Sequence, residues 1–467
     1  MNSITDFLDL EDQDVFVSDI KIEGQTRILT IETHPGRHFC PQCGFRMHSR
    51  GIKERRINHP VLQGNYRLLL LLKQRRWKCT NSDCGFEMNE SFRFVDKHKR
   101  NTNVTDMLIV DAFRDLYSTA ADIARRFHLS DTQVLDVFDR YVKLDRLPLT
   151  DAISIDEVFL DMDPRCKYAL IIQDFHTGDP IDILRSRRTD VTEPYFASIP
   201  KEERLGVKYL ISDMYNPYIQ YVNRYFPTAV PVVDSFHVIQ WIIRELDNFT
   251  RQLLRRFKER DRIRQEQLSH DLHRDVKLPG SDEVYLLQNY RWLLLKNQKD
   301  ITYSKIPRFD SHFRCHMDTY DYERRFFDLN PYLKDMRDYK EMYISFNDRY
   351  AGDPESAARE LDWLISFYLA CQNGIFTDFA RLLKKYRDPI ISSFIMVSKM
   401  GPGGIYDARL SNGPIESINR KVKDLKRMGR GFRNFQHMRT RFLFSTRHNP
   451  VINGSSCASP VQYFINE

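Results

Sequence analysis

The chain has 467 residues, of which 42% are apolar, with 71 lysines and arginines against 64 aspartates and glutamates. This length suits about two to four domains with packed cores, which excludes a disordered polyelectrolyte. The longest aliphatic run, LLLLL at 68–72, is far shorter than the ~18 residues of a membrane span, and the acidic start does not match a signal peptide. The composition therefore predicts a soluble cytoplasmic protein without a membrane partner.

Positive charge is concentrated in two segments of the chain. Residues 46–78 and 417–447 are strongly basic, whereas the first 14 residues are acidic. Clustered positive charge indicates a polyanionic partner such as nucleic acid. A merely solvated basic face is the alternative interpretation.

Four of the eight cysteines stand in two close pairs. Cys40 and Cys43 occur in CPQCG, and Cys79 and Cys84 in CTNSDCG. Each pair can present two thiolates to one tetrahedral zinc ion, with a glycine turning the backbone behind it. A disulfide or an iron site of the same geometry are the alternatives. The isolated cysteines are interpreted as ordinary thiols: Cys166, Cys315, Cys371 and Cys457.

The segments around these pairs have the alternating apolar pattern of strands, in VFVSDIKIEGQTRILTIE and YRLLLLLKQRRWKC. We therefore predict a β-rich zinc-ribbon domain over residues 1–100, with one structural zinc ion. Its basic side chains suit contact with phosphates. They are Arg46, Arg50, Lys53, Arg55, Arg56, Arg75, Arg76 and Lys78.

Residues 101–148 contain a candidate helix-turn-helix in TAADIARRFHLSDTQVLDVFDRYV. Two apolar helical patterns flank a short turn, and Ser130 is a plausible N-cap of the second helix. His128 replaces the glycine common in such turns, and two aspartates suit a DNA-facing surface poorly, so a plain helical hairpin is the alternative. The residues expected to face outward and to contact DNA are Thr132, Gln133 and Arg140.

The pattern changes to strands after Pro148. Three short apolar runs, AISIDEVFLDM, KYALIIQDF and PIDILRS, follow at hairpin spacing, and then strand and helix alternate. Three antiparallel strands followed by alternating helix and strand is the order of a ribonuclease H-like α/β fold. The first part of this catalytic core is assigned to residues 149–237.

Two aspartates of this segment are expected to meet across adjacent strands. Asp156 lies in the first strand, and Asp213 ends the fourth. Neighbouring carboxylates repel each other unless a cation lies between them, and carboxylate oxygens suit Mg²⁺ with phosphate oxygens as further ligands. Aspartates at strand ends are also common turn residues. The neighbouring acids Glu157, Asp161, Asp163 and Asp174 are competing candidates.

The segment SNGPIESINRKVKDLKRMGRGF at 411–432 opens with one acid and continues with basic residues. An apolar stripe at helical spacing predicts a packed helix, and Glu416 falls on a neighbouring face with three of the basic residues. The basic side chains can follow a DNA backbone. The candidates for DNA contact here are Arg420, Lys421, Lys423, Lys426, Arg427, Arg430 and Arg433.

Taken together, the cysteine pairs, the helix-turn-helix pattern, SIDEVFL, LISDMYNPY, VVDSFHVIQ and SNGPIESINRKVKDLKRMGRGF resemble the ISL3 family of bacterial insertion-sequence transposases. The resemblance implies a DDE transposase whose catalytic triad is Asp156, Asp213 and Glu416. Asp234 and His237 match a supporting D-x-x-H element, although His237 is also explained as a residue of a strand-to-helix junction.

The resemblance also implies that an all-helical insertion, residues 238–405, interrupts the catalytic core. The core then ends in a helical part at 406–447 that carries Glu416, and a tail follows at 448–467. Trp292 is the candidate for stacking on a flipped base, with a buried core tryptophan as the alternative.

The implied activity is binding of the terminal inverted repeats of an insertion sequence, followed by strand cleavage and strand transfer with two Mg²⁺ or Mn²⁺ ions. The implied partner is double-stranded DNA, bound by a homodimer or larger synaptic complex near the nucleoid. A DNA-binding regulator and a ribonuclease H-like nuclease without joining activity are the alternatives.

Overall fold

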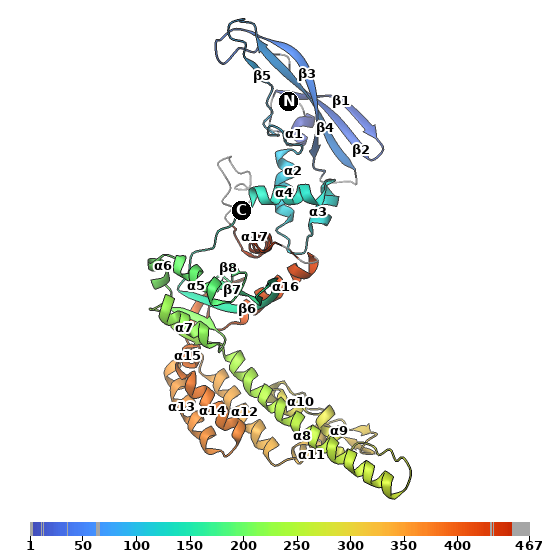
Figure 1. Ribbon diagram of the computed structural model, residues 1–467, viewed down its shortest axis with the longest axis vertical. Coiled ribbons are helices and arrows are strands. Elements are labelled where there is room, and N and C mark those ends of the chain that lie inside the picture. Colours follow the sequence, from blue (N-terminus) through green and yellow to red (C-terminus); the bar gives the residue numbers. More distant parts are fainter. Residues whose placement is uncertain are drawn as a thin grey trace. The chain divides into compact units, whose positions relative to one another are not determined.

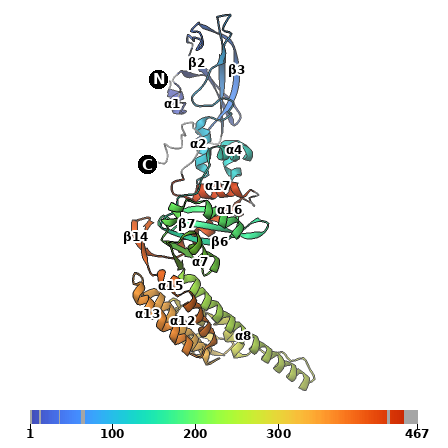
Figure 2. The same ribbon diagram turned by 60° about the vertical axis from the view of Figure 1, so that its left-hand side comes forward.

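The computed structural model describes residues 3–10, 12, 14–34, 36–61, 66–429, 432 and 434–450. The chain forms two compact units (Figure 1, Figure 2). The first contains Met1–Arg146, Phe159–Lys167 and Arg420–Glu467, and the second contains Leu147–Val158 and Tyr168–Asn419. Both contain helices and a sheet, so the predicted multidomain α/β class is confirmed. Within the described ranges, every helix is too short or too polar to cross a membrane.

The first unit begins with a β-sheet module. Its strands follow the alternating apolar patterns, and they pack on a core that includes Ile31, Leu70 and Leu72. The order is β1-β2-β4-β3, with β5 paired to β4 and with β2 and β4 parallel. The elements are α1 (Ser3–Phe7), β1 (Val15–Glu23), β2 (Thr26–Thr33), β3 (Met47–His59), β4 (Arg67–Cys79) and β5 (Glu87–Asn89).

A group of short helices completes the first unit: α2 (Asn103–Ala112), α3 (Ala120–Phe127), α4 (Asp131–Tyr141) and α17 (Phe435–Thr446). Ser130 and Gln133 form a capping box at the start of α4. The Ser130 hydroxyl accepts from the backbone N–H of Gln133, and the side-chain oxygen of Gln133 accepts from the backbone N–H of Ser130. His128 ends α3 at φ 54°, so this turn has a left-handed residue without glycine. Ile123, Ala124 and Phe127 face Val134, Val137 and Phe138 as buried apolar residues of the helix pair.

The second unit is built on a five-stranded sheet with the order β10-β9-β6-β7-β8. The pair β7–β8 is antiparallel, whereas β6–β9 and β9–β10 are parallel. Buried Ile153, Leu210 and Phe226 belong to its core. The elements are β6 (Ala152–Asp163), β7 (Cys166–Asp174), β8 (Pro180–Leu184), α5 (Thr189–Ser198), α6 (Lys201–Leu205), β9 (Tyr209–Ser212), α7 (Asn216–Tyr225) and β10 (Val230–Val233).

A mainly helical segment follows β10 and packs around its own apolar core, which includes Leu246, Tyr343 and Phe379. Its helices are α8 (Ser235–Asp271), α9 (Asp282–Asn289), α10 (Trp292–Leu295), η1 (Gln298–Asp300), α11 (Thr319–Phe327), α12 (Tyr332–Arg349), α13 (Pro354–Ala370), α14 (Gly374–Lys385) and α15 (Arg387–Ser392).

The expectation that residues 238–405 are entirely helical is wrong. The hairpin of β11 (Arg308–Asp310) and β12 (Cys315–Met317) lies inside this segment. A second hairpin, β13 (Met396–Gly401) and β14 (Gly404–Arg409), crosses its end. Both hairpins have strands of only three to six residues, and such short strands leave almost no apolar periodicity in the sequence.

Helix α16 (Gly413–Met428) follows the second hairpin. The apolar stripe predicted from its sequence is buried, and it consists of Ile415, Ile418, Val422 and Leu425. The face with Glu416, Arg420, Lys423 and Arg427 is exposed, as the helical spacing predicts.

Candidate active site and candidate metal centre

Two aspartates lie level with each other on neighbouring parallel strands of the second unit. The register pairs Ser154 of β6 with Ile211 of β9. Asp156 and Asp213 each lie two residues farther along their chains, so parallel pairing brings both carboxyl groups to the same edge of the sheet. The structure thus places these two predicted site residues close together.

Asp156 is a half-buried carboxyl group with two hydrogen-bond donors. The backbone N–H of Glu157 donates to Oδ1 at 2.7 Å, and the side-chain amide of Asn419 donates to Oδ2 at 2.7 Å. Burial raises the pKa of Asp156 to about 6, and the negative charge of Asp213 contributes to the rise. Burial beside a second carboxyl group therefore disfavours the ionised form of Asp156.

Asp213 and His237 have polar atoms that the protein leaves without partners. Oδ1 of Asp213 and Nε2 of His237 are both buried and make no hydrogen bond among the described residues. Burial raises the pKa of Asp213, while a positive charge on His237 opposes the rise. The unpaired buried oxygen of Asp213, beside a second carboxyl group, is an arrangement that a cation would satisfy.

The start of α16 is anchored beside Asp156 by two asparagines. The side-chain amide of Asn412 donates to the carbonyl of Ile155 at 3.4 Å, and Asn419 donates to Asp156 itself. Asn412 is fully buried and Asn419 is 8% exposed. Together they hold the segment that contains Glu416 against strand β6.

Asp234 strengthens the same anchor. It is the buried N-cap residue of α8, and the backbone N–H groups of Asn412 and Phe236 lower its pKa against the effect of burial. Burial raises the pKa of Asp234. This predicted supporting residue therefore connects α8 with the loop in front of α16.

Glu416 itself is exposed, and its carboxylate makes no hydrogen bond or ion pair within the described part of the chain. It lies one helical turn before Asn419, which binds Asp156. The structure therefore places the two aspartates close enough for the charge of one to affect the pKa of the other. Glu416 lies on α16, and among the described residues its carboxylate makes no hydrogen bond or ion pair with them.

Glu157 is surrounded by side chains that no sequence motif predicts. The guanidinium of Arg187 and the hydroxyl of Tyr218 both donate to this carboxylate, the latter at 2.6 Å. Arg187 also lies over the rings of Tyr168 and Tyr215, at 4.9 and 5.5 Å. Glu157 is thus fixed by partners of its own, although its position beside Asp156 had made it a competing candidate. The only sign of this group in the sequence is that Glu157 directly follows Asp156 in SIDEVFL.

Asn412 and Asn419 were also missed. A detectable signal was that asparagine is unfavourable inside helices, yet Asn419 occupies the second turn of α16. A buried asparagine in that position usually has a specific partner.

The four paired cysteines of the first unit form a second candidate site. Their sulfur atoms all lie within 4.8 Å of one another, with Cys40–Cys84 at 3.7 Å and Cys43–Cys79 at 3.4 Å. Four thiolates at ~2.3 Å from one tetrahedral ion would be about 3.8 Å apart. The predicted clustering is confirmed, and the donor set fits a structural metal ion.

Each cysteine pair is a tight turn. The N–H of Gly44 donates to the carbonyl of Cys40 at 2.9 Å, and the N–H of Gly85 donates to the carbonyl of Asn81 at 3.3 Å. Both glycines have positive φ, 74° and 59°, a conformation that other residues adopt with strain. The glycines therefore explain how the backbone turns behind each pair.

The residues predicted to contact DNA differ in their surroundings. On α16, Lys426 donates to the carbonyl of Leu160 and Arg427 pairs with Asp424 at 3.3 Å, whereas the others are exposed. Arg430 and Arg433 lie outside the described residues. The exposed remainder is Arg420, Lys421 and Lys423.

In the helix-turn-helix candidate, Thr132, Gln133 and Arg140 are exposed, and Arg140 lies 3.6 Å from Asp106. Trp292 is half-buried against the helical core, with the ammonium of Lys296 over its ring at 5.4 Å. The core packing agrees with the alternative that was considered for this tryptophan.

Comparison with known proteins decides the family. The ISL3 family model, described as a transposase, matches residues 153–442, which is more than half of the chain. The chain belongs to the ISL3 transposase family. The resemblance inferred from the motifs is thereby confirmed, and the matched span of this family member contains both aspartates and Glu416.

Two curated relatives of this ISL3-family member are transposases for insertion sequence element IS1557, from the Mycobacterium tuberculosis strains CDC 1551 / Oshkosh and ATCC 25618 / H37Rv. Each is 24% identical to it over 324 residues. The aligned region is 68% of this chain and 65% of each relative, so the chain spans slightly less than two thirds of their length.

Proposed function

We propose that the protein is a DNA transposase that cleaves the ends of an insertion sequence and joins them to target DNA. The observation that carries this proposal is the pair of carboxyl groups on adjacent parallel strands, Asp156 and Asp213, both with pKa values raised by burial. Family membership supplies the reaction class.

The catalytic core is proposed to be ribonuclease H-like. Three consecutive strands, β6 to β8, are followed by β9 and β10 on the other side of β6, and the last two pairs are parallel. This order supports the proposal, because it places the middle of the first strand beside the end of the fourth. Glu416 on α16 is proposed as the third carboxylate.

The donor set fits Mg²⁺ or Mn²⁺. Asp213 has an unpaired carboxylate oxygen, Asp156 lies beside it, and Glu416 is a third carboxylate on an exposed helix face. All three are hard oxygen ligands that leave positions for phosphate. Asp156, Asp213 and Glu416 would hold the ions. When bound, two such ions would polarise the scissile phosphate and stabilise the attacking and leaving oxygens.

The protein's own groups would prepare this site. Asn419 fixes one oxygen of Asp156, so the other carboxyl oxygen keeps a defined direction. Arg187 and Tyr218 donate hydrogen bonds to Glu157, so this carboxylate would not compete with Asp156 as a metal ligand. The exposed cations of α16 would bind phosphates on the same DNA strand.

The reaction consists of two in-line displacements at phosphorus. In the first, the oxygen of water bonds to phosphorus and the bond to the 3′ oxygen breaks, which releases a 3′-hydroxyl. In the second, that hydroxyl attacks a target phosphodiester, and the target's own 3′ oxygen leaves. No covalent intermediate with the protein is needed.

End recognition is proposed for the first unit. The four-cysteine cluster would hold one Zn²⁺ in a zinc ribbon, and the helix-turn-helix would place α4 on the duplex. Two ends must be brought together for transfer, so we propose a homodimer or larger assembly.

The test is incubation of the full chain with end DNA, a target plasmid and Mg²⁺. We expect cleavage and joined product from the wild type, and loss of both by at least 100-fold in Glu416→Gln. Asp424→Asn, which removes a carboxylate from the same helix, is the matched control and should keep activity. Joined product in Glu416→Gln at the control's level would overturn the triad.

The same assay separates the alternatives. A nuclease without joining activity would give cleaved ends and no joined product. A DNA-binding regulator would bind end DNA without cleaving it, and Asp213→Asn would then change nothing.

A further inference from the structure

Helix α8 is unusually long and connects the candidate active site with a distant surface. It starts directly after Asp234, includes His237 in its first turn, and continues for 37 residues. At 1.5 Å per residue this is about 55 Å. Within the second unit, its far half lies beside α9, and its far end projects away from α12 and α13 (Figure 1, Figure 2).

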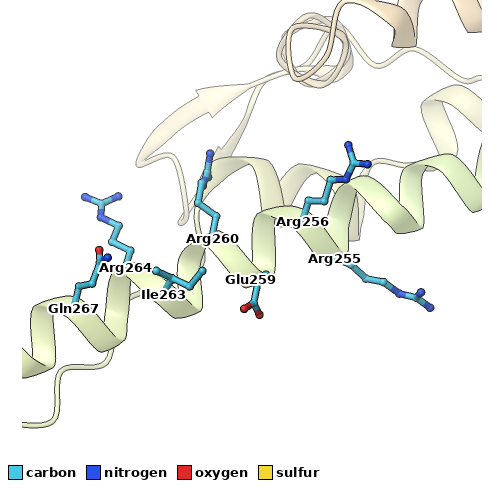
Figure 3. A pocket seen from close by; sticks show the side chains of 7 residues that line it. All are labelled: Arg255, Arg256, Glu259, Arg260, Ile263, Arg264 and Gln267. Carbon is cyan, nitrogen blue, oxygen red and sulfur yellow. The ribbon is translucent and has the colours of Figure 1, made fainter.

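The far half of α8 carries four arginines around one hollow, which we call the arginine surface: Arg255, Arg256, Arg260 and Arg264. Figure 3 shows three of them on one side of the helix and Arg255 on the other. The same hollow contains Ile263, which is 43% exposed, and a single acid, Glu259.

Most of this charge has no internal partner. Among the described residues, Arg255, Arg256 and Arg264 have no carboxylate within salt-bridge distance, whereas Arg260 pairs with Glu283 at 3.0 Å. The acid of the hollow, Glu259, pairs with Arg262 at 2.7 Å and not with the arginines of this surface.

Arg262, on the same helix, is by contrast an arginine whose charge is neutralised by acids. It forms ion pairs with both Glu259 and Glu266. Like charges at helical spacing destabilise a helix. An unpaired arginine cluster in the same helix is therefore unfavourable alone and favourable beside a polyanion.

We propose that the arginine surface binds the phosphates of duplex DNA that continues past the cleavage site. This inference rests on the proposed transposase function. Arg256 and Arg264 lie 19 and 27 residues after His237, which corresponds to about 28 and 40 Å along the helix. At ~3.4 Å per base pair, a duplex that follows α8 reaches this surface about 8–12 base pairs from the cleaved phosphate.

The experiment compares full-length wild type with Arg255→Gln/Arg256→Gln/Arg264→Gln. Two series of end duplexes are used, one lengthened from about 5 to about 20 base pairs on the element side and one on the flanking side. We expect one series to bind wild type more tightly when lengthened. The triple variant should lose this gain, and its slope of log affinity against log salt should fall by about 2–3, since each lost phosphate contact lowers it by ~0.9.

The matched control is Arg262→Gln/Arg324→Gln/Arg381→Gln, which removes three exposed arginines that pair with acids of their own helices. It should keep the gain and the slope. The series that shows the gain identifies the DNA as element or flanking sequence. A triple variant that equals wild type on both series would overturn the inference, as would the absence of any gain in wild type.

Cleavage of the short duplex separates this inference from the proposed function. The short duplex does not reach the arginine surface, so the triple variant should cleave it as wild type does. If the triple variant cleaves normally and binds long duplexes as wild type does, only the inference is wrong. If wild type cleaves no duplex, the proposed function is wrong and so is the inference.

Discussion

Individual carboxyl groups give the candidate site its physical character. Asp156 is half-buried beside Asp213, and its pKa is raised to about 6 by burial. A folded-state pKa above the ordinary 3.8 means that the folded protein binds the proton more tightly than the unfolded chain does. Its contribution to stability is thus complete below about pH 4 and is lost as pH rises through 6.

Asp156→Asn should remove this dependence on pH. A rise of about 2 pKa units corresponds to about 3 kcal/mol. Without added Mg²⁺ or Mn²⁺, the free energy of unfolding of wild type relative to Asp156→Asn should therefore fall by about 2 kcal/mol between pH 4 and pH 7, because the unfolded carboxyl group is already more than half ionised at pH 4. Denaturant titrations at both pH values measure this difference, and parallel curves for the two proteins would contradict it. Added Mg²⁺ should stabilise wild type only.

Asn419 is predicted to act on the reaction through Asp156. The hydrogen bond from Asn419 lowers the pKa of Asp156, so Asn419→Ala should raise that pKa. The acidic limb of the pH–rate profile for cleavage should then move to higher pH. Asn419→Gln tests whether a longer amide restores the profile. A uniform loss of activity without a shift of the limb would show that Asn419 is merely structural.

At the scale of elements, buried arginines determine which helices belong together. Arg441 of α17 is 3% exposed and donates to the carbonyls of Phe113, Asp115 and Ser118 after α2. Burial lowers the pKa of Arg441 to about 10. Its guanidinium group therefore supplies donors to three carbonyls of the segment that follows α2.

Arg441→Met should destabilise the first unit by about 2–4 kcal/mol, because several buried carbonyls lose their donor. Thermal unfolding of the full chain measures the effect. Arg381→Met is the control, since this arginine is exposed and pairs only with Asp378 of its own helix. A Tm for Arg441→Met equal to that of the control would refute the role of Arg441.

These elements also show where sequence reasoning succeeds. The runs at 152–162 and 167–175 predict strands because they are short and apolar, and they are found as β6 and β7, both largely buried. The hairpin β11–β12 was missed because three-residue strands carry no period. Glu157 was recognised as a competitor, but its fixation by Arg187 depends on residues 30 positions apart.

For the whole molecule, the division into two units could not be derived from sequence. Residues 159–167 and 420–467 cluster with the amino-terminal module, although long stretches of chain separate them from it. Lys426 donates to the carbonyl of Leu160, which joins these two segments to each other, and Arg441 donates to the carbonyl of Phe113 in the amino-terminal part. These partners are 266 and 328 positions apart, and neither periodicity nor composition encodes such a distance.

The family and the four-cysteine cluster could be predicted because they depend on local motifs. CPQCG and CTNSDCG each fix two thiolates and a glycine turn within a few residues. The position of Glu416 could not be settled in this way, because it depends on how Asn412 and Asn419 hold α16 against β6.

The whole-molecule prediction is that zinc supports end binding and leaves the chemistry intact. The four cysteines lie in the first unit and both aspartates in the second. Purified protein should contain one zinc ion per chain, and Cys79→Ser/Cys84→Ser should contain none, whereas Cys166→Ser/Cys371→Ser should keep it. The first variant should bind end DNA at least tenfold more weakly, yet cleave it within about twofold of the wild-type rate at saturating DNA, because the loss then falls on recognition alone. If the zinc-free variant bound end DNA as tightly as wild type, the zinc ribbon would have no role in end recognition. A lower cleavage rate at saturating DNA would show that the two units depend on each other for catalysis.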